Sequence, residues 1–131
     1  MTDYVNDPTL PAPPFPGSHM VLDDCYVFVS GLTASDIQEG ENAIGDIKEE
    51  TRRVMRELER MLALVETSFA DVLRVDIHLA DLGDIGEMDS VYAEFFENDR
   101  YPARTCTESP RLSGGSGVEI TLMATRPDRS R

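Results

Sequence analysis

The sequence is poor in several residue types, and each shortage narrows what the protein can be. Its 131 residues include no tryptophan, two cysteines (Cys25 and Cys106) and two histidines (His19 and His78). None of these stands in the closely spaced pairs that zinc sites use, so we expect no metal and two free thiols. No run of about 18 apolar residues exists, which excludes a transmembrane helix. The N-terminus also lacks the pattern of a signal peptide, so the cytoplasm is the expected location.

Positive charge is scarce as well. Acidic residues outnumber basic residues by 25 to 12, which gives a formal net charge of -13 at pH 7. Proteins that bind nucleic acids without sequence preference do so mainly through Lys and Arg, which release counterions from phosphates. The composition therefore disfavours a nucleic-acid-binding protein. It disfavours binding to anionic membranes for the same electrostatic reason.

The chain is predicted to divide into three parts. Residues 1–16 hold five of the eight prolines, at positions 8, 11, 13, 14 and 16. Such a segment favours polyproline II and cannot pair as a central strand, so we expect an N-terminal arm. Residues 17–126 are expected to form a single domain, because the length and the 40% apolar content suit one modest core. Residues 127–131 are a polar tail.

Hydrophobic periodicity predicts the secondary structure of the domain. The predicted elements are, in order, strands at 20–22 and 25–30, a helix at 44–65, a strand at 73–82, a helix at 84–96, and strands at 103–108 and 118–125. This order predicts the α+β class, with two α-helices packed on one face of a mixed sheet. The outer sheet face would carry Tyr26, Phe28 and Met123, which are too apolar for water. We therefore expect this face to be buried against another subunit.

The last two strands hold the residue types best suited to chemistry. If the loop between them closes a symmetric antiparallel hairpin, Cys106 lies opposite Glu119 and Arg104 lies opposite Thr121. All four side chains would then share the sheet face that the helices leave open. The residues alone allow two interpretations. One is a buried salt bridge between Arg104 and Glu119 that joins strands or subunits, and the other is a pocket in which Arg104 binds an anion and Glu119 transfers protons.

Several motifs carry a resemblance that favours the pocket. The sequence contains VSG at 29–31, DIHLADLGDIGEMDSVYAEFF at 76–96, YPARTC at 101–106 and GVEITLMA at 117–124. These segments resemble the YjgF/RidA family, also catalogued as L-PSP endoribonuclease-like, and the similarity covers about residues 17–126. The resemblance implies a chorismate-mutase-like α+β fold and a homotrimer with clefts between subunits. It also implies an enamine/imine deaminase that hydrolyses 2-imino or 2-enamino acids, such as 2-aminoacrylate, to 2-keto acids and ammonia without a cofactor.

The resemblance also assigns roles to individual residues. Arg104 matches the arginine that binds the substrate carboxylate, and Glu119 matches the acid that positions and activates water. Cys106 and Ser30 match a cysteine and a serine of the substrate pocket. Tyr92 matches a tyrosine that is more structural than catalytic. The expected partners are therefore a small carboxylate-bearing imine or enamine and further copies of the chain.

Three positions depart from the family pattern. Gly17 stands where deaminating members commonly have a pocket tyrosine, and Leu32 replaces a glutamine that usually follows the Ser-Gly pair. Asp89 stands where an asparagine is usual. It would add a negative charge to the substrate-binding site if its side chain faces inward.

Two other functions stay open at this point. The same trimeric scaffold would suit a non-catalytic protein that binds a small metabolite or responds to it, because a fold does not determine a function. An L-PSP-type endoribonuclease is the third possibility, and the net charge of -13 argues against it.

Overall fold

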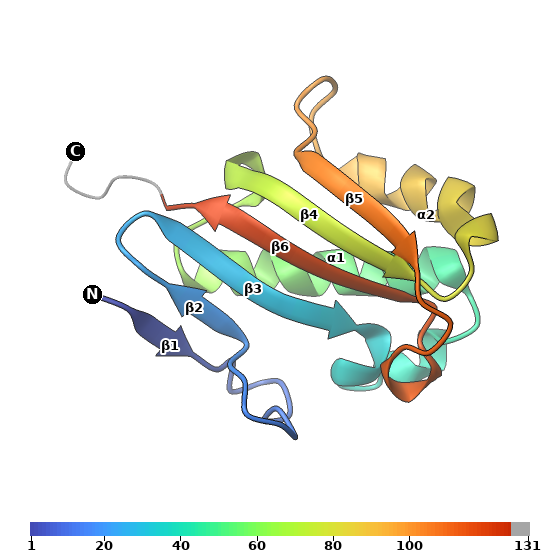
Figure 1. The fold of residues 1–131 in the computed structure, drawn as a ribbon, viewed down its shortest axis with the longest axis horizontal. Coiled ribbons are helices and arrows are strands. Elements are labelled where there is room, and N and C mark those ends of the chain that lie inside the picture. Colours follow the sequence, from blue (N-terminus) through green and yellow to red (C-terminus); the bar gives the residue numbers. More distant parts are fainter. Residues whose placement is uncertain (127–131) are drawn as a thin grey trace.

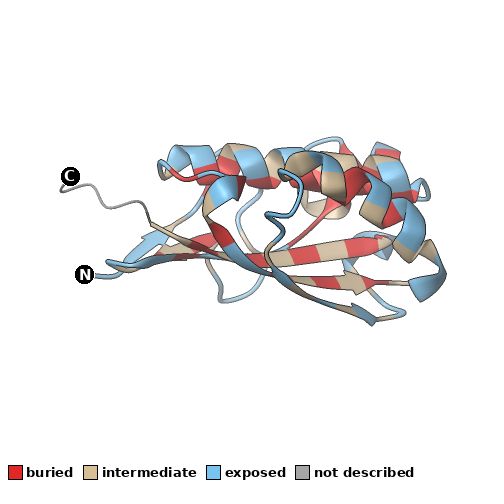
Figure 2. Ribbon diagram, turned by 90° about the horizontal axis from the view of Figure 1, so that it is seen from above, coloured by how far each residue is buried: buried red, intermediate tan, exposed pale blue. Residues whose placement is uncertain are grey.

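The computed structural model describes residues 1–126 and has two layers, a six-stranded sheet and two α-helices on one of its faces (Figure 1, Figure 2). The strands are β1 (Asp3–Val5), β2 (Met20–Leu22), β3 (Tyr26–Thr33), β4 (Val72–Leu79), β5 (Ala103–Glu108) and β6 (Val118–Thr125). The helices are α1 (Ile47–Leu64) and α2 (Ile85–Tyr92). The predicted α+β class is confirmed. The predicted tail at 127–131 lies outside the described residues.

The order of strands across the sheet is β1-β2-β3-β6-β4-β5. Neighbouring strands are antiparallel except for β4 and β5, which are parallel, so the sheet is mixed as predicted. Helix α2 connects β4 to β5, and such a crossover is what a parallel pair requires. The predicted hairpin between the last two strands is wrong, because β4 lies between β5 and β6.

The register also separates residues that we expected on one face. Residues paired across strands point to the same side of a sheet, and Ile77, which is fully buried beneath the helices, pairs with Cys106. Cys106 and Arg104, two residues apart in β5, therefore both face the helical layer. Glu119 and Thr121 alternate with buried residues of β6 and point to the open face. The predicted common face is thus wrong.

Helix α1 contributes an apolar stripe to the core between the layers. Five residues of this stripe are at most 1% exposed, namely Val54, Met55, Leu58, Met61 and Leu62. The helix starts at Ile47 rather than at the predicted Ile44, because Gly45 has a positive φ of 103° and Asp46 caps the first turn. The Asp46 carboxylate accepts a hydrogen bond from the Glu49 backbone N–H at 3.2 Å. Within residues 1–126, neither helix is long and apolar enough to cross a membrane.

A buried carboxylate joins α1 to the sheet. Glu50 is only 2% exposed, and its carboxylate accepts hydrogen bonds from the backbone N–H groups of Gly45 (3.1 Å) and Gly117 (2.8 Å). Burying a carboxylate is costly unless donors satisfy it, and here two backbone donors do so. Because Gly117 immediately precedes β6, these bonds hold the start of α1 against the start of that strand.

Two segments contain more strand than predicted. The prediction ends the second strand at Ser30, but β3 continues to Thr33 with a shift in its register against β6 between Val29 and Leu32. Such a shift marks a bulge, which bends a strand without ending its pairing. The N-terminal segment, predicted as an arm, also contributes β1, which pairs with β2 at the edge of the sheet.

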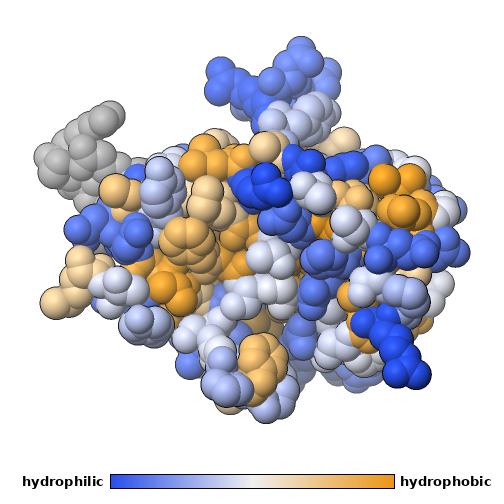
Figure 3. Space-filling view, viewed as in Figure 1, coloured by the Kyte–Doolittle hydropathy of each residue, from blue (hydrophilic) through white to orange (hydrophobic). Residues whose placement is uncertain are grey.

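The sheet face opposite the helices carries exposed aromatic side chains. Tyr26 and Phe28 are 39% and 42% exposed, and their ring centroids lie 6.2 Å apart. Met123 pairs with Phe28 across β6 and β3, so it lies on the same face, as predicted. Figure 3, which views this side of the molecule, shows an apolar area beside a polar one.

Candidate functional site

The N-terminal segment folds back beside β3 and helps to enclose a cavity of about 350 Å³, which we term the arm pocket. Its walls come from residues 10–15, from the bulge of β3 and from β6. The lining residues used below are Pro11, Phe15, His19, Ser30, Gly31 and Glu119. The proline rings and Phe15 make much of this wall apolar.

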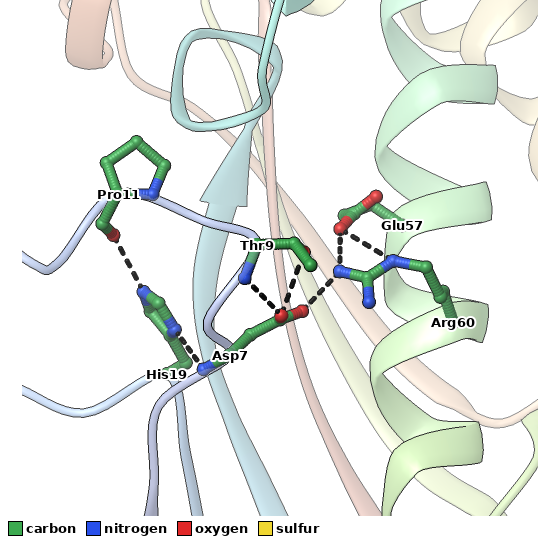
Figure 4. A network of polar contacts seen from close by, with 6 residues as sticks. All are labelled: Asp7, Thr9, Pro11, His19, Glu57 and Arg60. Atoms are coloured by element: carbon green, nitrogen blue, oxygen red, sulfur yellow. Dashed lines mark hydrogen bonds and ion pairs between the residues drawn. The ribbon is translucent and has the colours of Figure 1, made fainter.

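A buried aspartate holds the segment in place (Figure 4). The side chain of Asp7 is fully buried and accepts hydrogen bonds from the backbone N–H (2.9 Å) and the hydroxyl (2.8 Å) of Thr9. It also forms an ion pair with Arg60 of α1, which in turn contacts Glu57. Burial acts to raise the pKa of Asp7, but the bonds from Thr9 and Arg60 outweigh it and hold that pKa below its usual value.

His19 links the two ends of the folded-back segment. Its Nδ1 accepts a hydrogen bond from the backbone N–H of Asp7 at 2.8 Å, which leaves Nε2 to donate to the backbone oxygen of Pro11 at 3.1 Å. These partners require the neutral imidazole with its hydrogen on Nε2. The ring of His19 therefore closes the loop that forms one wall of the arm pocket.

Glu119 lies half-buried at the arm pocket, against the bulge of β3. A Cβ atom at Gly31 would lie 2.9 Å from the Glu119 carboxyl carbon, so a side chain at position 31 would have to displace the Glu119 side chain. No other residue within 1–126 forms a hydrogen bond or an ion pair with the Glu119 carboxylate. Its oxygens are free to accept hydrogen bonds from a water molecule or a ligand.

Ser30 and Gly17 lie close to the same cavity. The Ser30 hydroxyl donates to the backbone oxygen of Ser18 at 2.6 Å and lines the arm pocket beside Glu119. Gly17 does not line it. A Cβ atom at Gly17 would lie 2.6 Å from the ring of Phe15, which does line the pocket. The ring of Phe15 thus occupies the space that a side chain at position 17 would need.

A second cavity of about 290 Å³ lies between α2 and the start of β5, and we term it the α2 pocket. It is lined by Asp89, Tyr92, Ala93, Tyr101, Pro102 and Arg104. The Arg104 guanidinium donates to the Asp89 carboxylate through both terminal nitrogens, at 2.5 and 3.4 Å. Its central carbon lies 5.2 Å from the centre of the Tyr92 ring, within the range of a cation–π contact.

The charges in the α2 pocket perturb its titratable groups. The hydrogen bond to Asp89 raises the pKa of Arg104 further above its usual value. Burial raises the pKa of Tyr92 to about 12, and Arg104 only partly opposes this effect. Burial likewise raises the pKa of the Cys106 thiol, which packs against the core two residues beyond Arg104. The Cys106 thiol is therefore neutral at pH 7 and is not poised as a nucleophile.

The structure thus places the predicted site residues in two groups. Glu119 and Ser30 line the arm pocket, whereas Arg104 and Asp89 line the α2 pocket with Cys106 on the same face of β5. The first alternative, a salt bridge between Arg104 and Glu119, is wrong within the chain because the guanidinium pairs with Asp89. The prediction missed the arm residues Asp7 and His19, since proline content alone says nothing about where a segment docks.

Metal binding has no candidate in the described part of the chain. Residues 1–126 contain no group of three His, Cys, Asp or Glu side chains placed to hold a metal ion. The fold and the two pockets define a small α+β domain with the Glu119 carboxylate at one cavity and the Arg104–Asp89 ion pair at the other.

Comparison with known proteins identifies the family. The family described as Endoribonuclease L-PSP matches residues 9–126, and the chain belongs to this family, which is the YjgF/RidA family of the sequence resemblance. A RutC family protein of Pyrococcus horikoshii is 32% identical over 124 residues, which cover 95% of this chain and 98% of that protein. A human protein named 2-iminobutanoate/2-iminopropanoate deaminase is 28% identical, covering 83% of this chain and 79% of that protein.

Solved structures agree with this assignment. A putative endoribonuclease from Thermotoga maritima superimposes with a TM-score of 0.86 at 28% identity, covering 97% of this chain and 99% of that one. The family resemblance and the fold class that it implied are therefore confirmed.

Proposed function

We propose that the protein is an enamine/imine deaminase that hydrolyses 2-imino or 2-enamino acids to 2-keto acids and ammonia. The observation that carries the proposal is the Glu119 carboxylate, which has no protein partner within residues 1–126 and borders a cavity of about 350 Å³. The names of the mammalian relatives, at about 30% identity, support the same chemistry.

The reaction needs little more than a positioned proton carrier. A protonated imine is already electrophilic at its C=N carbon. An enamine becomes a protonated imine by taking a proton on its β-carbon. Glu119 accepts a proton from water as the water oxygen attacks the C=N carbon of the protonated imine, and then passes that proton to the nitrogen. The carbon–nitrogen bond then breaks as Glu119 takes the proton of the new hydroxyl group, leaving the keto acid and ammonia. Such proton transfer contributes about 10²- to 10⁴-fold in rate.

We further propose that the complete site forms between subunits of a homotrimer. Arg104 and Glu119 point to opposite faces of the sheet, and their strands are separated by β4. One small substrate cannot contact both side chains of the same chain, because two strand spacings alone are about 10 Å. Two copies could bring the two pockets together, and the apolar area on the open face supports such an assembly.

The test is hydrolysis of imino acids that an amino-acid oxidase generates, with semicarbazide capturing what remains. Glu119→Gln keeps the shape of the side chain but cannot accept the proton. We expect it to lower the rate at least about 100-fold with little change in melting temperature. The matched control is Glu59→Gln on the exposed face of α1, which should keep full activity. Full activity in Glu119→Gln would overturn the proposal.

A specific observation favours a second candidate, a trimer that binds keto acids or related metabolites without turnover. Position 17 is a glycine, and the ring of Phe15 lies in the space beside it, so no tyrosine hydroxyl reaches the cavity from there. If the protein binds a keto acid but hydrolyses none of the imines tested, this second function is the correct one.

A further inference from the structure

The α2 pocket contains its own carboxylate. Asp89 and Arg104 are the two charged residues of its lining, so the formal charges of the lining sum to zero. A pocket that attracts a carboxylate ligand normally presents an excess of positive charge. Here the ligand would find the guanidinium already paired with a carboxylate of the protein.

The pairing uses the geometry that a ligand carboxylate would need. Asp89 accepts from both terminal nitrogens of Arg104, one bond to each oxygen, at 2.5 and 3.4 Å. This is the bidentate arrangement in which arginine binds carboxylates most specifically. The side chain of Arg104 is 25% exposed and that of Asp89 is 43% exposed, so a ligand can reach both.

The ring of Tyr92 restricts where the guanidinium can go. Arg104 lies over this ring at 5.2 Å, and Tyr92 is only 4% exposed. Asp89 and Tyr92 both belong to α2, one turn apart, so the helix holds both partners of Arg104 in fixed positions. A ligand carboxylate must therefore displace Asp89 from the guanidinium or bind beside it, and in both cases two negative charges lie close together.

We propose that Asp89 determines the specificity of this site by occupying Arg104, so that a ligand carboxylate binds more weakly than it would to an unpaired arginine, whereas an uncharged carbonyl group, such as a carboxamide, is little affected. The inference rests on the proposed function for the choice of ligands, which are analogues of its keto acid products. Asp89 contacts Arg104 and no reacting atom, so it is a specificity-determining residue and not a catalytic one.

The test measures binding of two probes by titration calorimetry, namely 2-oxobutanoate and its uncharged analogue 2-oxobutanamide. In Asp89→Asn we expect the affinity for the carboxylate to rise about tenfold, because one nearby negative charge is gone. The affinity for the amide should change less than about twofold. The matched control is Glu94→Gln, which removes a charge close to the end of α2 that pairs with Arg52 at 2.9 Å and does not contact Arg104.

A second pair of variants shows whether Asp89 acts through Arg104. In an Arg104→Ala background, Asp89→Asn should raise the affinity for 2-oxobutanoate much less than in the wild type. If the affinity for 2-oxobutanoate rises equally in both backgrounds, Asp89 repels the ligand directly. That result would overturn the proposal that Asp89 acts by occupying Arg104. If Asp89→Asn fails to fold, the same measurements are made on Asp89→Ser, because the shorter serine side chain cannot reach the Arg104 guanidinium.

The outcomes separate this inference from the proposed function. An unchanged ratio of the two affinities in Asp89→Asn, or no binding of the carboxylate by that variant, overturns the role of Asp89. Absence of imine hydrolysis by both the wild type and Asp89→Asn overturns the deaminase proposal, while the affinity ratio still decides what Asp89 does.

Discussion

At the scale of single residues, two glutamates show how position determines the role of one side-chain type. Glu50 is buried, and backbone N–H groups of Gly45 and Gly117 satisfy its carboxylate. Glu119 is half-buried beside a cavity and has no such partner within 1–126. The first residue therefore serves the fold, and the second is available for chemistry.

Glu50→Ala should be strongly destabilising. It removes the acceptor for two backbone donors and leaves a cavity, so the free energy of unfolding should fall by about 2 kcal/mol or more. Denaturant titration measures this change. Glu49→Ala, which removes only a half-exposed ion pair with Arg53, should cost less than about 0.5 kcal/mol. Similar losses in the two variants would contradict the role given to Glu50.

At the scale of elements, the N-terminal segment is attached by side-chain contacts rather than by a continuous strand. After β1 the chain leaves the sheet, and the bonds of Asp7 and His19 bring it back over the end of β3. A wall of the arm pocket therefore depends on a few polar contacts.

Acid should weaken this attachment. The folded protein holds the pKa of Asp7 below its ordinary value of 3.8, so the stabilisation by Asp7 is complete above that pH and is lost as the pH falls through the lower folded value. Asp7→Asn should therefore melt at a lower temperature than the wild type at pH 7, and the difference should shrink in acid. Thermal melts at several pH values measure this.

The control for this prediction is Asp3→Asn, because Asp3 lies exposed in β1. Its melting temperature should follow that of the wild type at every pH. A difference between Asp7→Asn and the wild type that persists unchanged below pH 3 would exclude titration of Asp7 as the cause.

At the scale of the whole molecule, the open sheet face carries a group of neighbouring apolar side chains that are exposed in the single chain. Tyr26 and Phe28 are about two-fifths exposed in the single chain, beside Met123. Exposed apolar areas of this kind commonly mark interfaces between subunits. The separation of Arg104 from Glu119 also supports an interface between subunits, because the two pockets lie apart within one chain.

Phe28→Glu should disrupt the proposed trimer. A charge in the middle of an apolar interface is costly, whereas in the single chain Phe28 is 42% exposed and the fold should tolerate the change. Sedimentation equilibrium should give about three times 14.6 kDa for the wild type and a single chain for the variant. The control is Leu64→Glu at the end of α1, where Leu64 is 54% exposed on the helical side. A wild type of 14.6 kDa would exclude the trimer.

Periodicity in the sequence was enough to predict the two α-helices and every strand except β1. The stripe of α1 and the alternation along β4, β5 and β6 follow from the spacing of apolar residues, because burial on one side imposes a period on each element. The same alternation placed Tyr26 and Phe28 on one face. The motifs that match the family also singled out Arg104 and Glu119 as candidates.

The tertiary structure alone decided how the elements meet. Alternation tells which residues of one strand share a face, but it does not tell which strand lies beside it or in which register. The hairpin prediction assumed that neighbours in sequence are neighbours in space, and the parallel crossover through α2 put β4 between them. For the same reason the partner of Arg104 is Asp89 on a helix and not Glu119, because a side chain pairs with whatever the packing of layers brings within reach.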